Sequence, residues 1–208
     1  MSILSKMGAE SKSLEKPPDD ARRNRLLDAA LGVFLRYGFR KTSMDQVARA
    51  ADMSRQGLYL HFSTKEDLFL ATVRHSMEVS LRLASEGLSD ASLPLEERLV
   101  RGFDAWVGRY VGMVGADAKD LSEVLSTSGV QEVATHHEAL FLEAVAKVLR
   151  ASGLVAAYKS TGLTARQLTD TLFATARGLK YLSGTREAFV QGIGVAVRAL
   201  CMPLGASR

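Results

Sequence analysis

Residues 43–69 read SMDQVARAADMSRQGLYLHFSTKEDLF, and helix-start signals divide this stretch into three segments. In the capping box S/T-x-x-E/Q, two side chains satisfy amide groups that a helix start leaves free. Two such boxes occur, and one serine between them is a suitable N-cap. These positions are Ser43 with Gln46, Ser63 with Glu66, and Ser54. The stretch therefore predicts a short helix ending near Ala51, a tight turn, a second short helix over 55–61, and then a long helix.

A longer amphipathic helix is expected just before this stretch, over residues 20–37. Its apolar residues recur at the three- and four-residue spacing of one helical stripe, and Gly38 is a suitable left-handed stop. Short helices are marginal in isolation and persist only by packing on their neighbours. Apolar residues for this packing are present at Val47, Ala48, Ala51, Leu58 and Phe62. One long and two short helices in quick succession are typical of a helix-turn-helix.

The second short helix presents residue types that suit the reading of DNA bases. A helix-turn-helix inserts the N-terminal residues of that helix into the major groove. Arg55 can pair with guanine and Gln56 with adenine, each through two hydrogen bonds worth about 1–3 kcal/mol of discrimination. The small and polar residues beside them are Ser54, Gly57 and Tyr59. Taken alone, Arg55 could equally be a solvated charge and Tyr59 a ring over the small core, and His61 is expected to pack or hydrogen bond inside the domain.

The surrounding pattern resembles the DNA-binding domain of the tetracycline-repressor (TetR) family over about residues 22–70, and the segment GLYLHFSTKEDLF matches it closely. The residues that show the resemblance are Leu27, Ala30, Phe34, Gly38, Phe39, Thr42, Val47, Ala48, Ser54, Gly57, Leu58, Tyr59, His61, Phe62, Lys65, Leu68 and Phe69. Beyond residue 70 only the chain length and the number of expected helices agree. The resemblance implies an all-helical homodimer that binds a palindromic double-stranded DNA operator and is released by a small molecule.

The resemblance also implies roles for particular residues. Thr42, Tyr59 and Lys65 correspond to phosphate contacts, Ser43 follows Thr42 at the start of the next helix, and residues 54–57 form the base-reading edge. Physical chemistry agrees with a phosphate near these positions, because the free amides at a helix N-terminus attract anions. Lys65 lies in the first turn of a helix, where its charge opposes the helix dipole. A phosphate partner would account for that mismatch.

Composition and charge place limits on the compartment and the partners. The chain has 208 residues, with 27 Lys+Arg, 23 Asp+Glu and a single cysteine. One cysteine forms no internal disulfide, so a reducing cytoplasm is the expected location. The longest uninterrupted apolar run covers residues 29–35, far short of the roughly 18 that a membrane helix needs, so no membrane partner is expected. Residues 1–19 lack the apolar stretch of a signal peptide and are expected to form a mobile arm.

The rest of the chain predicts a larger helical domain. The expected fold class is therefore all-α, with a three-helix helix-turn-helix DNA-binding domain over 20–68 and a C-terminal helical ligand-binding and dimerisation domain over 69–208. Thr164 with Gln167 forms another capping box. Further helices are expected over residues 64–86, 94–114, 118–127, 130–151, 164–182 and 185–201. Small residues on the last two favour close packing across a two-fold axis; in the TetR family these helices usually form the dimer interface, and internal packing is the alternative.

An apolar effector pocket is expected between the middle helices of this domain. Aromatic, methionine and a few polar side chains suit a mostly apolar ligand of moderate size. The candidate residues are Phe103, Trp106, Tyr110, Met113, His136, His137, Phe141, Phe173 and Arg177. Core packing explains the same residues equally well.

Two other functions remain open at this point. Glu132 and His136 share a helix face, as metal ligands often do, but bundle metalloenzymes use two Glu-x-x-His elements and the sequence has no second one. We expect no catalytic residues, no metal and no cofactor, and hence no enzyme. Alternatively, the C-terminal domain is a protein-interaction platform without a small-molecule effector. Repression is favoured over activation, because blocking a promoter needs no additional surface.

Overall fold

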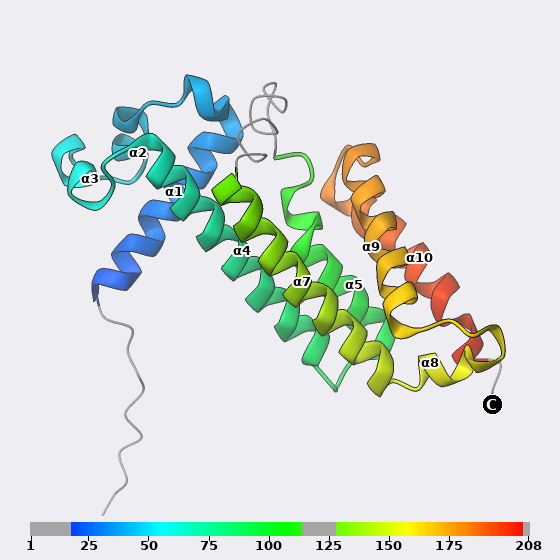
Figure 1. Ribbon diagram of the computed structural model, residues 1–208. Helices are drawn as coiled ribbons and strands as arrows, with labels where there is room; N and C mark the ends of the chain where they lie inside the picture. The colour runs from blue at the N-terminus through cyan, green and yellow to red at the C-terminus, as the bar shows by residue number, and fades with distance from the viewer. Residues whose placement is uncertain (1–17, 114–127, 206–208) are drawn as a thin grey trace, which may run out of the picture.

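The computed structural model describes residues 18–113 and 128–205, and in these ranges the chain forms helices and turns without any strand (Figure 1). The helices are α1 (Pro18–Lys41), α2 (Met44–Ala50), α3 (Arg55–His61), α4 (Lys65–Ser89), α5 (Leu95–Trp106), η1 (Gly108–Tyr110), α7 (Ser128–Ala151), α8 (Leu154–Ala157), η2 (Lys159–Thr161), α9 (Ala165–Leu182) and α10 (Arg186–Gly205). The predicted all-α fold class is confirmed. The predicted helix over 118–127 lies outside the described residues, as does the predicted arm except for residues 18 and 19, which begin α1.

The first three helices and the start of α4 pack around a small core of their own. At its centre the ring centroid of Phe69 lies 5.0 Å from that of Phe34 and 5.1 Å from that of Phe39. The buried aliphatic side chains around this trio are Leu26, Leu27, Ala30, Val33, Met44, Val47, Ala48, Leu58 and Leu68. Because α2 and α3 have only seven residues each, this shared core is what stabilises them.

Most of the predicted helix caps are confirmed. Ser43, Ser54 and Thr164 are N-caps, and each side chain accepts a hydrogen bond from the amide three residues later. The predicted box at Ser63 is wrong, because the N-cap of α4 is its neighbour Thr64, whose hydroxyl accepts from an amide 3.0 Å away. Ser63 and Thr64 are adjacent in the sequence, so only the backbone conformation at the start of α4 decides which of them is the N-cap.

Helix α1 ends differently from the prediction. Gly38 has a φ of 78°, a conformation that favours glycine, so the predicted break is confirmed. A further helical turn follows it and continues to Lys41, four residues beyond the expected end. At the other end of the chain, α10 continues through Pro203 instead of ending at residue 201.

Helix α5 ends at Trp106, well before the predicted end at residue 114, and the short 3-10 helix η1 follows. A Cβ atom at Gly108 would lie 2.8 Å from the ring of Phe189 in α10. The missing side chain therefore allows α10 to approach the chain closely at this point. The short helices α8 and η2, between Gly153 and Gly162, were not predicted.

Helix α4 links the two parts of the molecule. It leaves the small N-terminal core and packs against α1 near its start and along α5 and α7 beyond (Figure 1). His75 on α4 lies with Nε2 2.9 Å from Oδ1 of Asp28 on α1. Met77 packs against the buried clusters of both parts. The predicted domain boundary at residues 68 and 69 thus falls inside one continuous helix, and the division remains a prediction.

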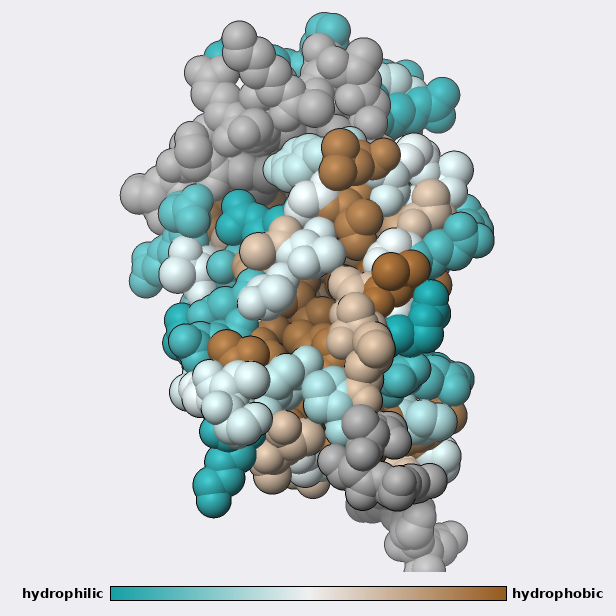
Figure 2. Space-filling model, turned by 90° about the vertical axis from the view of Figure 1, so that its right-hand side faces the viewer, coloured by the Kyte–Doolittle hydropathy of each residue, from teal (hydrophilic) through white to brown (hydrophobic). Residues whose placement is uncertain are grey.

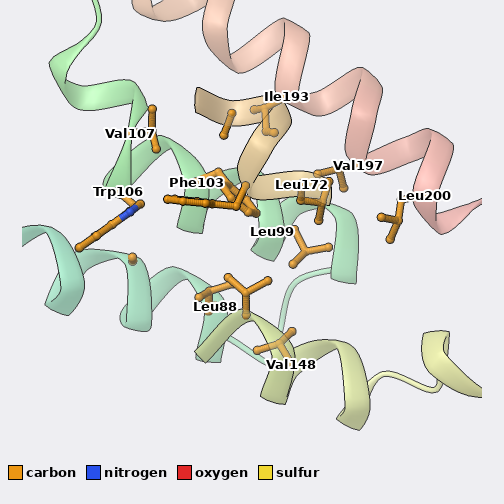
Figure 3. Close-up of a cluster of buried hydrophobic side chains, with 14 of the residues drawn as sticks. Leu88, Leu99, Phe103, Trp106, Val107, Val148, Leu172, Ile193, Val197 and Leu200 are labelled. Carbon is orange, nitrogen blue, oxygen red and sulfur yellow. The ribbon is translucent and has the colours of Figure 1, made fainter. Parts of the chain in front are cut away.

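The C-terminal part has a larger apolar core. Figure 3 shows that its side chains converge from α4, α5, α7, α9 and α10. The labelled residues are Leu88, Leu99, Phe103, Trp106, Val107, Val148, Leu172, Ile193, Val197 and Leu200. These helices are far apart in the sequence, so their association depends on long-range burial of apolar surface.

One helix in the described ranges is long and apolar enough to be considered for a membrane span. It covers Arg186–Leu204 in α10, with a mean hydropathy of 1.3. Phe189, Ile193 and Val197 on this helix are fully buried in the core described above. Core helices of water-soluble proteins pass the same test, so the composition of α10 is weak support for a membrane span.

Candidate nucleic-acid interface

The turn between α2 and α3 sets the direction of α3. Asp52 adopts a positive φ of 53°, and the next amide, on Met53, donates to the carbonyl of Ala48 at 3.0 Å. Leu58 is fully buried and Phe62 nearly so, and both attach α3 to the small core. The predicted helix-turn-helix is therefore formed, with one face of α3 inside the domain and the other in solvent.

The solvent face of α3 presents the predicted base-reading side chains. Arg55 and Gln56 are exposed, and the guanidinium carbon of Arg55 lies 5.7 Å from the ring centroid of Tyr59. Tyr59 is 40% exposed, so its ring does not simply cover the core. His61 is exposed as well, and the expectation that it packs inside the domain is wrong. Leu60, which the sequence interpretation did not single out, is 83% exposed on the same helix.

Two of the predicted serines stand at helix starts. The hydroxyl of Ser54 accepts from the amide of Gly57 at 3.0 Å, and a Cβ atom at position 57 would lie 3.1 Å from that hydroxyl. Ser43 is exposed and forms a reciprocal pair with Gln46, whose side-chain oxygen accepts from the Ser43 amide at 2.8 Å. The cap geometry holds both serines in place at the edge of the solvent face.

Thr42 is buried, which differs from its predicted role. Its residue is 3% exposed, and its hydroxyl donates to the carbonyl of Gly38 at 2.6 Å. The hydroxyl therefore closes the end of α1 and does not face solvent. A direct phosphate contact by this side chain does not fit the described geometry.

Lys65 also has partners within the domain. Its ammonium donates to the carbonyls of Phe39 at 2.9 Å, Arg40 at 3.4 Å and Thr42 at 3.1 Å, and it lies 4.4 Å from the ring centroid of Phe39. A cation that binds the last carbonyls of a helix is favourable. The hydrogen bonds to carbonyls at the end of α1 thus explain why the positive charge of Lys65 lies at the N-terminus of α4. The argument that this charge indicates a phosphate partner is therefore wrong. A phosphate contact by Lys65 remains only a prediction.

The predicted effector residues come together, but as packed rings. The ring centroid of Phe141 lies 5.2 Å from Phe103, 4.9 Å from Trp106 and 6.4 Å from Phe173. Trp106 and Phe141 are stacked at an interplanar angle of 11°. Phe103 and Phe141 are fully buried. The rings contact one another, so the space assigned to a ligand is filled by this aromatic cluster.

The other predicted effector residues lie around the cluster or apart from it. Arg177 is exposed, with its guanidinium carbon 5.8 Å from the ring of Phe173. His137 is buried, and its Nδ1 lies 2.8 Å from the carbonyl of Val133 in the same helix. Met113 is 52% exposed.

Tyr110 belongs to a separate polar group between η1 and α4, which no sequence pattern indicated. Its hydroxyl lies 2.6 Å from the hydroxyl of Ser76 and 2.7 Å from that of Ser80. Arg109 approaches the same group, with Nη1 3.5 Å from the Ser80 hydroxyl. The two serines are buried on α4, so this group connects the C-terminal part to the helix that follows α3 in the chain.

The candidate metal site does not assemble among the described residues. No group of three histidine, cysteine, aspartate or glutamate side chains there could hold a metal ion. Glu132 and His136 are exposed on α7, and the ring of His136 is 5.3 Å from that of His137.

Sequence comparison identifies the N-terminal part. Residues 26–72 match the family model for bacterial regulatory proteins of the tetR family. Over 141 residues the chain is 29% identical to the HTH-type transcriptional regulator SrpR of Pseudomonas putida, which covers 62% of this chain and 59% of that protein. Over 61 residues it is 41% identical to the HTH-type transcriptional activator FasR of Mycolicibacterium smegmatis, covering 29% and 28% of the two chains. The chain thus matches less than two thirds of the length of these relatives.

Structural comparison extends the likeness to the whole fold. A TetR transcriptional regulator from Legionella pneumophila superimposes with a TM-score of 0.64 over 90% of this chain and 98% of that chain, at 19% identity. The chain thus resembles the tetR family of bacterial regulatory proteins in the sequence of its N-terminal part, and TetR transcriptional regulators in its fold. These relatives are transcriptional regulators and not enzymes, which agrees with the prediction from the sequence.

Proposed function

We propose that the protein is a transcriptional regulator that binds a palindromic double-stranded DNA operator as a homodimer and is released by a small, mostly apolar effector. The observation that supports the DNA-binding step is the solvent face of α3, where Arg55, Gln56 and Tyr59 are exposed on a helix that the buried Leu58 attaches to the core. Two such helices must lie about 34–36 Å apart to enter successive major-groove faces.

Charge around this face favours DNA. Exposed arginines occur on α1 and α2 as well as on α3, at Arg22, Arg23, Arg25, Arg40, Arg49 and Arg55. Arg23 lies over the Phe62 ring, with its guanidinium carbon 5.7 Å from the centroid, which places a cation beside α3. Neutralising DNA phosphates releases counterions, so we expect operator affinity to fall steeply as salt rises.

Selection of bound fragments from a random DNA library tests the DNA-binding step. We expect an inverted repeat with half-sites about one helical turn apart. Arg55→Ala and Gln56→Ala should each relax base preference at one position per half-site, costing about 1–3 kcal/mol there. Arg150→Ala, at an exposed arginine near the end of α7, is the matched control and should leave the selected sequence unchanged. Failure to enrich any sequence over competitor DNA contradicts the proposal.

We place the dimer interface on α9 and α10. Figure 2 shows this face, with apolar residues along its middle and hydrophilic residues at its edges. The large apolar side chains exposed on the two helices are Tyr181, Leu182, Val195 and Met202. Gly178 leaves open space beside α9, whereas a Cβ at Gly192 would lie 2.8 Å from Leu179 in the same chain. Gly192 therefore allows close packing inside the protomer, and Gly178 leaves room for the close approach of a second protomer.

Sedimentation of single charge substitutions tests this interface. Val195→Glu and Leu182→Glu should each produce monomers and greatly weaken operator binding, because a charge would be buried in an apolar contact. Leu140→Glu on α7, where the leucine is 45% exposed, is the control and should remain dimeric. If both α9 and α10 variants stay dimeric, the interface lies elsewhere.

An effector site at the aromatic cluster is supported by one unpaired polar group. Thr169 is fully buried, and its hydroxyl has no hydrogen-bond partner among the described atoms. It precedes Phe173 by one helical turn, so both lie on the same face of α9. An unpaired buried hydroxyl costs about 1–3 kcal/mol. We propose that an apolar effector displaces part of the Phe103, Trp106, Phe141 and Phe173 packing and accepts a hydrogen bond from Thr169.

Release from DNA then follows from differential binding. Consider an effector that binds more tightly to a dimer in which the two α3 helices lie at a different separation. Its binding stabilises that form of the dimer and lowers operator affinity by the difference in its affinity for the two forms. Helix α4 is continuous between the two parts, and the His75–Asp28 contact links it to α1. Thermal-shift screening of apolar metabolites tests this step, and Thr169→Val should reduce the shift that a hit produces. A panel without any hit favours the alternative, in which the domain binds another protein.

Repression in the cytoplasm is the regulatory outcome that we propose. A dimer on a promoter blocks polymerase without any further contact surface, and the single cysteine, Cys201, suits a reducing compartment. Placing the selected operator across a reporter promoter should lower transcription, and increased transcription would instead indicate an activator, as the relative FasR is named.

A further inference from the structure

Leu60 is a strongly exposed apolar side chain on α3. It lies two residues from the fully buried Leu58, and two residues turn an α-helix by about 200°, so the two leucines point in opposite directions. Leu60 is 83% exposed, whereas Leu58 is fully buried. At this exposed position the large aliphatic side chain of Leu60 makes no contact with the core of the isolated domain.

The neighbours of Leu60 show which surface it shares. Gln56 precedes it by four residues and lies one helical turn away on the same face. Arg55 and Tyr59 form a separate pair on the adjoining face, with the guanidinium carbon 5.7 Å from the ring. On this part of the solvent face, therefore, an amide that can bond a base edge lies one helical turn from an aliphatic group.

The chemistry of Leu60 restricts what it can contact on DNA. It has no atom that donates to a phosphate or accepts from a base, so it adds nothing to charge or hydrogen-bond recognition. In the major groove the apolar feature of a base edge is the C5-methyl group of thymine, which aliphatic and aromatic side chains contact. Contact with that methyl group removes apolar surface of both partners from water.

We propose that Leu60 is a specificity-determining residue that recognises the C5-methyl group of one thymine per half-site, next to the base contacted by Gln56. This inference rests on the proposed function, because it requires α3 to enter the major groove. Its chemistry is separate from the hydrogen bonds of Arg55 and Gln56, since a methyl group can be removed from DNA without changing base pairing.

Deoxyuridine substitution provides the test. After selection of an operator by the unmodified protein, each thymine of a half-site is replaced in turn by deoxyuridine, in both half-sites, and affinity is measured by fluorescence anisotropy. One replacement should weaken binding about 3- to 10-fold, the effect of losing a buried methyl contact twice per dimer. Leu60→Ala should bind the thymine operator more weakly by a similar factor and should no longer distinguish the deoxyuridine operator from it.

Two further variants separate this role from others. Gln56→Ala should bind less tightly yet keep the deoxyuridine effect, and Leu140→Ala, an exposed leucine on α7, should behave like the unmodified protein. Unfolding of Leu60→Ala should be unchanged, because the side chain has no core contact in the monomer; Leu60→Met, which keeps an apolar side chain of similar size, should retain the deoxyuridine effect.

The outcomes are distinct. If the unmodified protein selects an operator but no deoxyuridine replacement weakens binding, or if Leu60→Ala keeps the full deoxyuridine effect, the role of Leu60 is disproved while the proposed function stands. If no DNA sequence is selected at all, the proposed function fails and this inference fails with it.

Discussion

The two cores of the molecule hold their aromatic rings in different ways. In the N-terminal core, Phe39 packs on Phe69 and also lies beneath the ammonium of Lys65, which donates to three carbonyls at the end of α1. In the C-terminal core, Phe141 is surrounded by other rings and aliphatic side chains. The first core adds directional bonds to its apolar packing, whereas the rings of the second are held by the filling of apolar space.

This difference explains why the match to the family model is confined to the N-terminal part, whereas the similarity in fold covers most of the chain. Directional bonds need particular residue types at particular positions, whereas many apolar sequences of suitable volume fill a core equally well. The family model accordingly matches residues 26–72, while the likeness in fold covers 90% of the chain at 19% identity. A DNA-reading surface also needs the accuracy of the first kind of core, because base contacts depend on hydrogen-bond geometry.

The largest effect is expected for the C-terminal core. Phe141→Ala should lower the free energy of unfolding by about 3–5 kcal/mol, because it removes a fully buried ring and leaves a cavity. Urea unfolding followed by circular dichroism measures the loss, and Leu140→Ala, at the partly exposed neighbouring position, is the control. A loss below about 1 kcal/mol would show that the rings line a collapsible pocket instead of a packed core.

A smaller effect is expected for the directional bonds of the N-terminal core. Lys65→Met keeps the apolar stem over Phe39 but leaves three carbonyls without their donor, which should cost about 1–3 kcal/mol. Lys147→Met, an exposed lysine on α7, is the matched control.

The same variant tests the phosphate contact. If Lys65 acts only inside the domain, the slope of log affinity against log salt should be unchanged in Lys65→Met after correction for the folded fraction. A reduction of the slope by about 0.9 in each subunit would show that the ammonium also contacts DNA.

The N-cap of α4 offers a comparison between adjacent residues. Thr64→Ala should cost about 1 kcal/mol, because the hydroxyl accepts from the Asp67 amide, whereas Ser63→Ala should cost little. Thermal unfolding of the two variants under identical conditions measures the difference. Equal losses, or a larger loss for Ser63→Ala, would support the cap that the sequence pattern predicts.

The smallest effect concerns the thiol of Cys201, on the inner side of α10. Burial raises the pKa of this thiol to about 11, with Glu96 adding to the shift. Since the thiolate is the reactive form, Ellman's reagent at pH 8 should modify the folded protein very slowly and the urea-unfolded protein at once. Rapid stoichiometric reaction of the folded protein would show that the inner side of α10 opens readily.

Local signals account for the part of the fold that could be predicted. These signals are the caps at Ser43, Ser54 and Thr164 and the break at Gly38. Each depends on residues within one helical turn of each other, so the amino-acid sequence alone is enough to predict it. The outward position of Arg55 and Gln56 follows from the same short-range periodicity.

The errors have both local and long-range origins. Thr42 was expected to contact DNA, but its hydroxyl donates to the carbonyl of Gly38 only four residues earlier. Helix α5 was expected to continue to residue 114 but ends at Trp106, and two residues later Phe189 of the distant helix α10 lies close to Gly108. Periodicity indicated that Phe103 and Phe141 face inward, yet it left open whether they line a pocket or pack on each other.

The order of residues alone determined most of the helices, the helix-turn-helix and the side chains that α3 offers to solvent, because hydrogen bonds and periodicity within a helix act over three or four residues. Only the tertiary structure decided that Lys65 binds the end of α1, that the aromatic rings fill the C-terminal core, and that apolar surface remains uncovered on α9 and α10. Those outcomes depend on which helices approach one another. Burial of apolar surface governs that approach, and because this interaction is non-directional, the order of residues does not show which helices will meet.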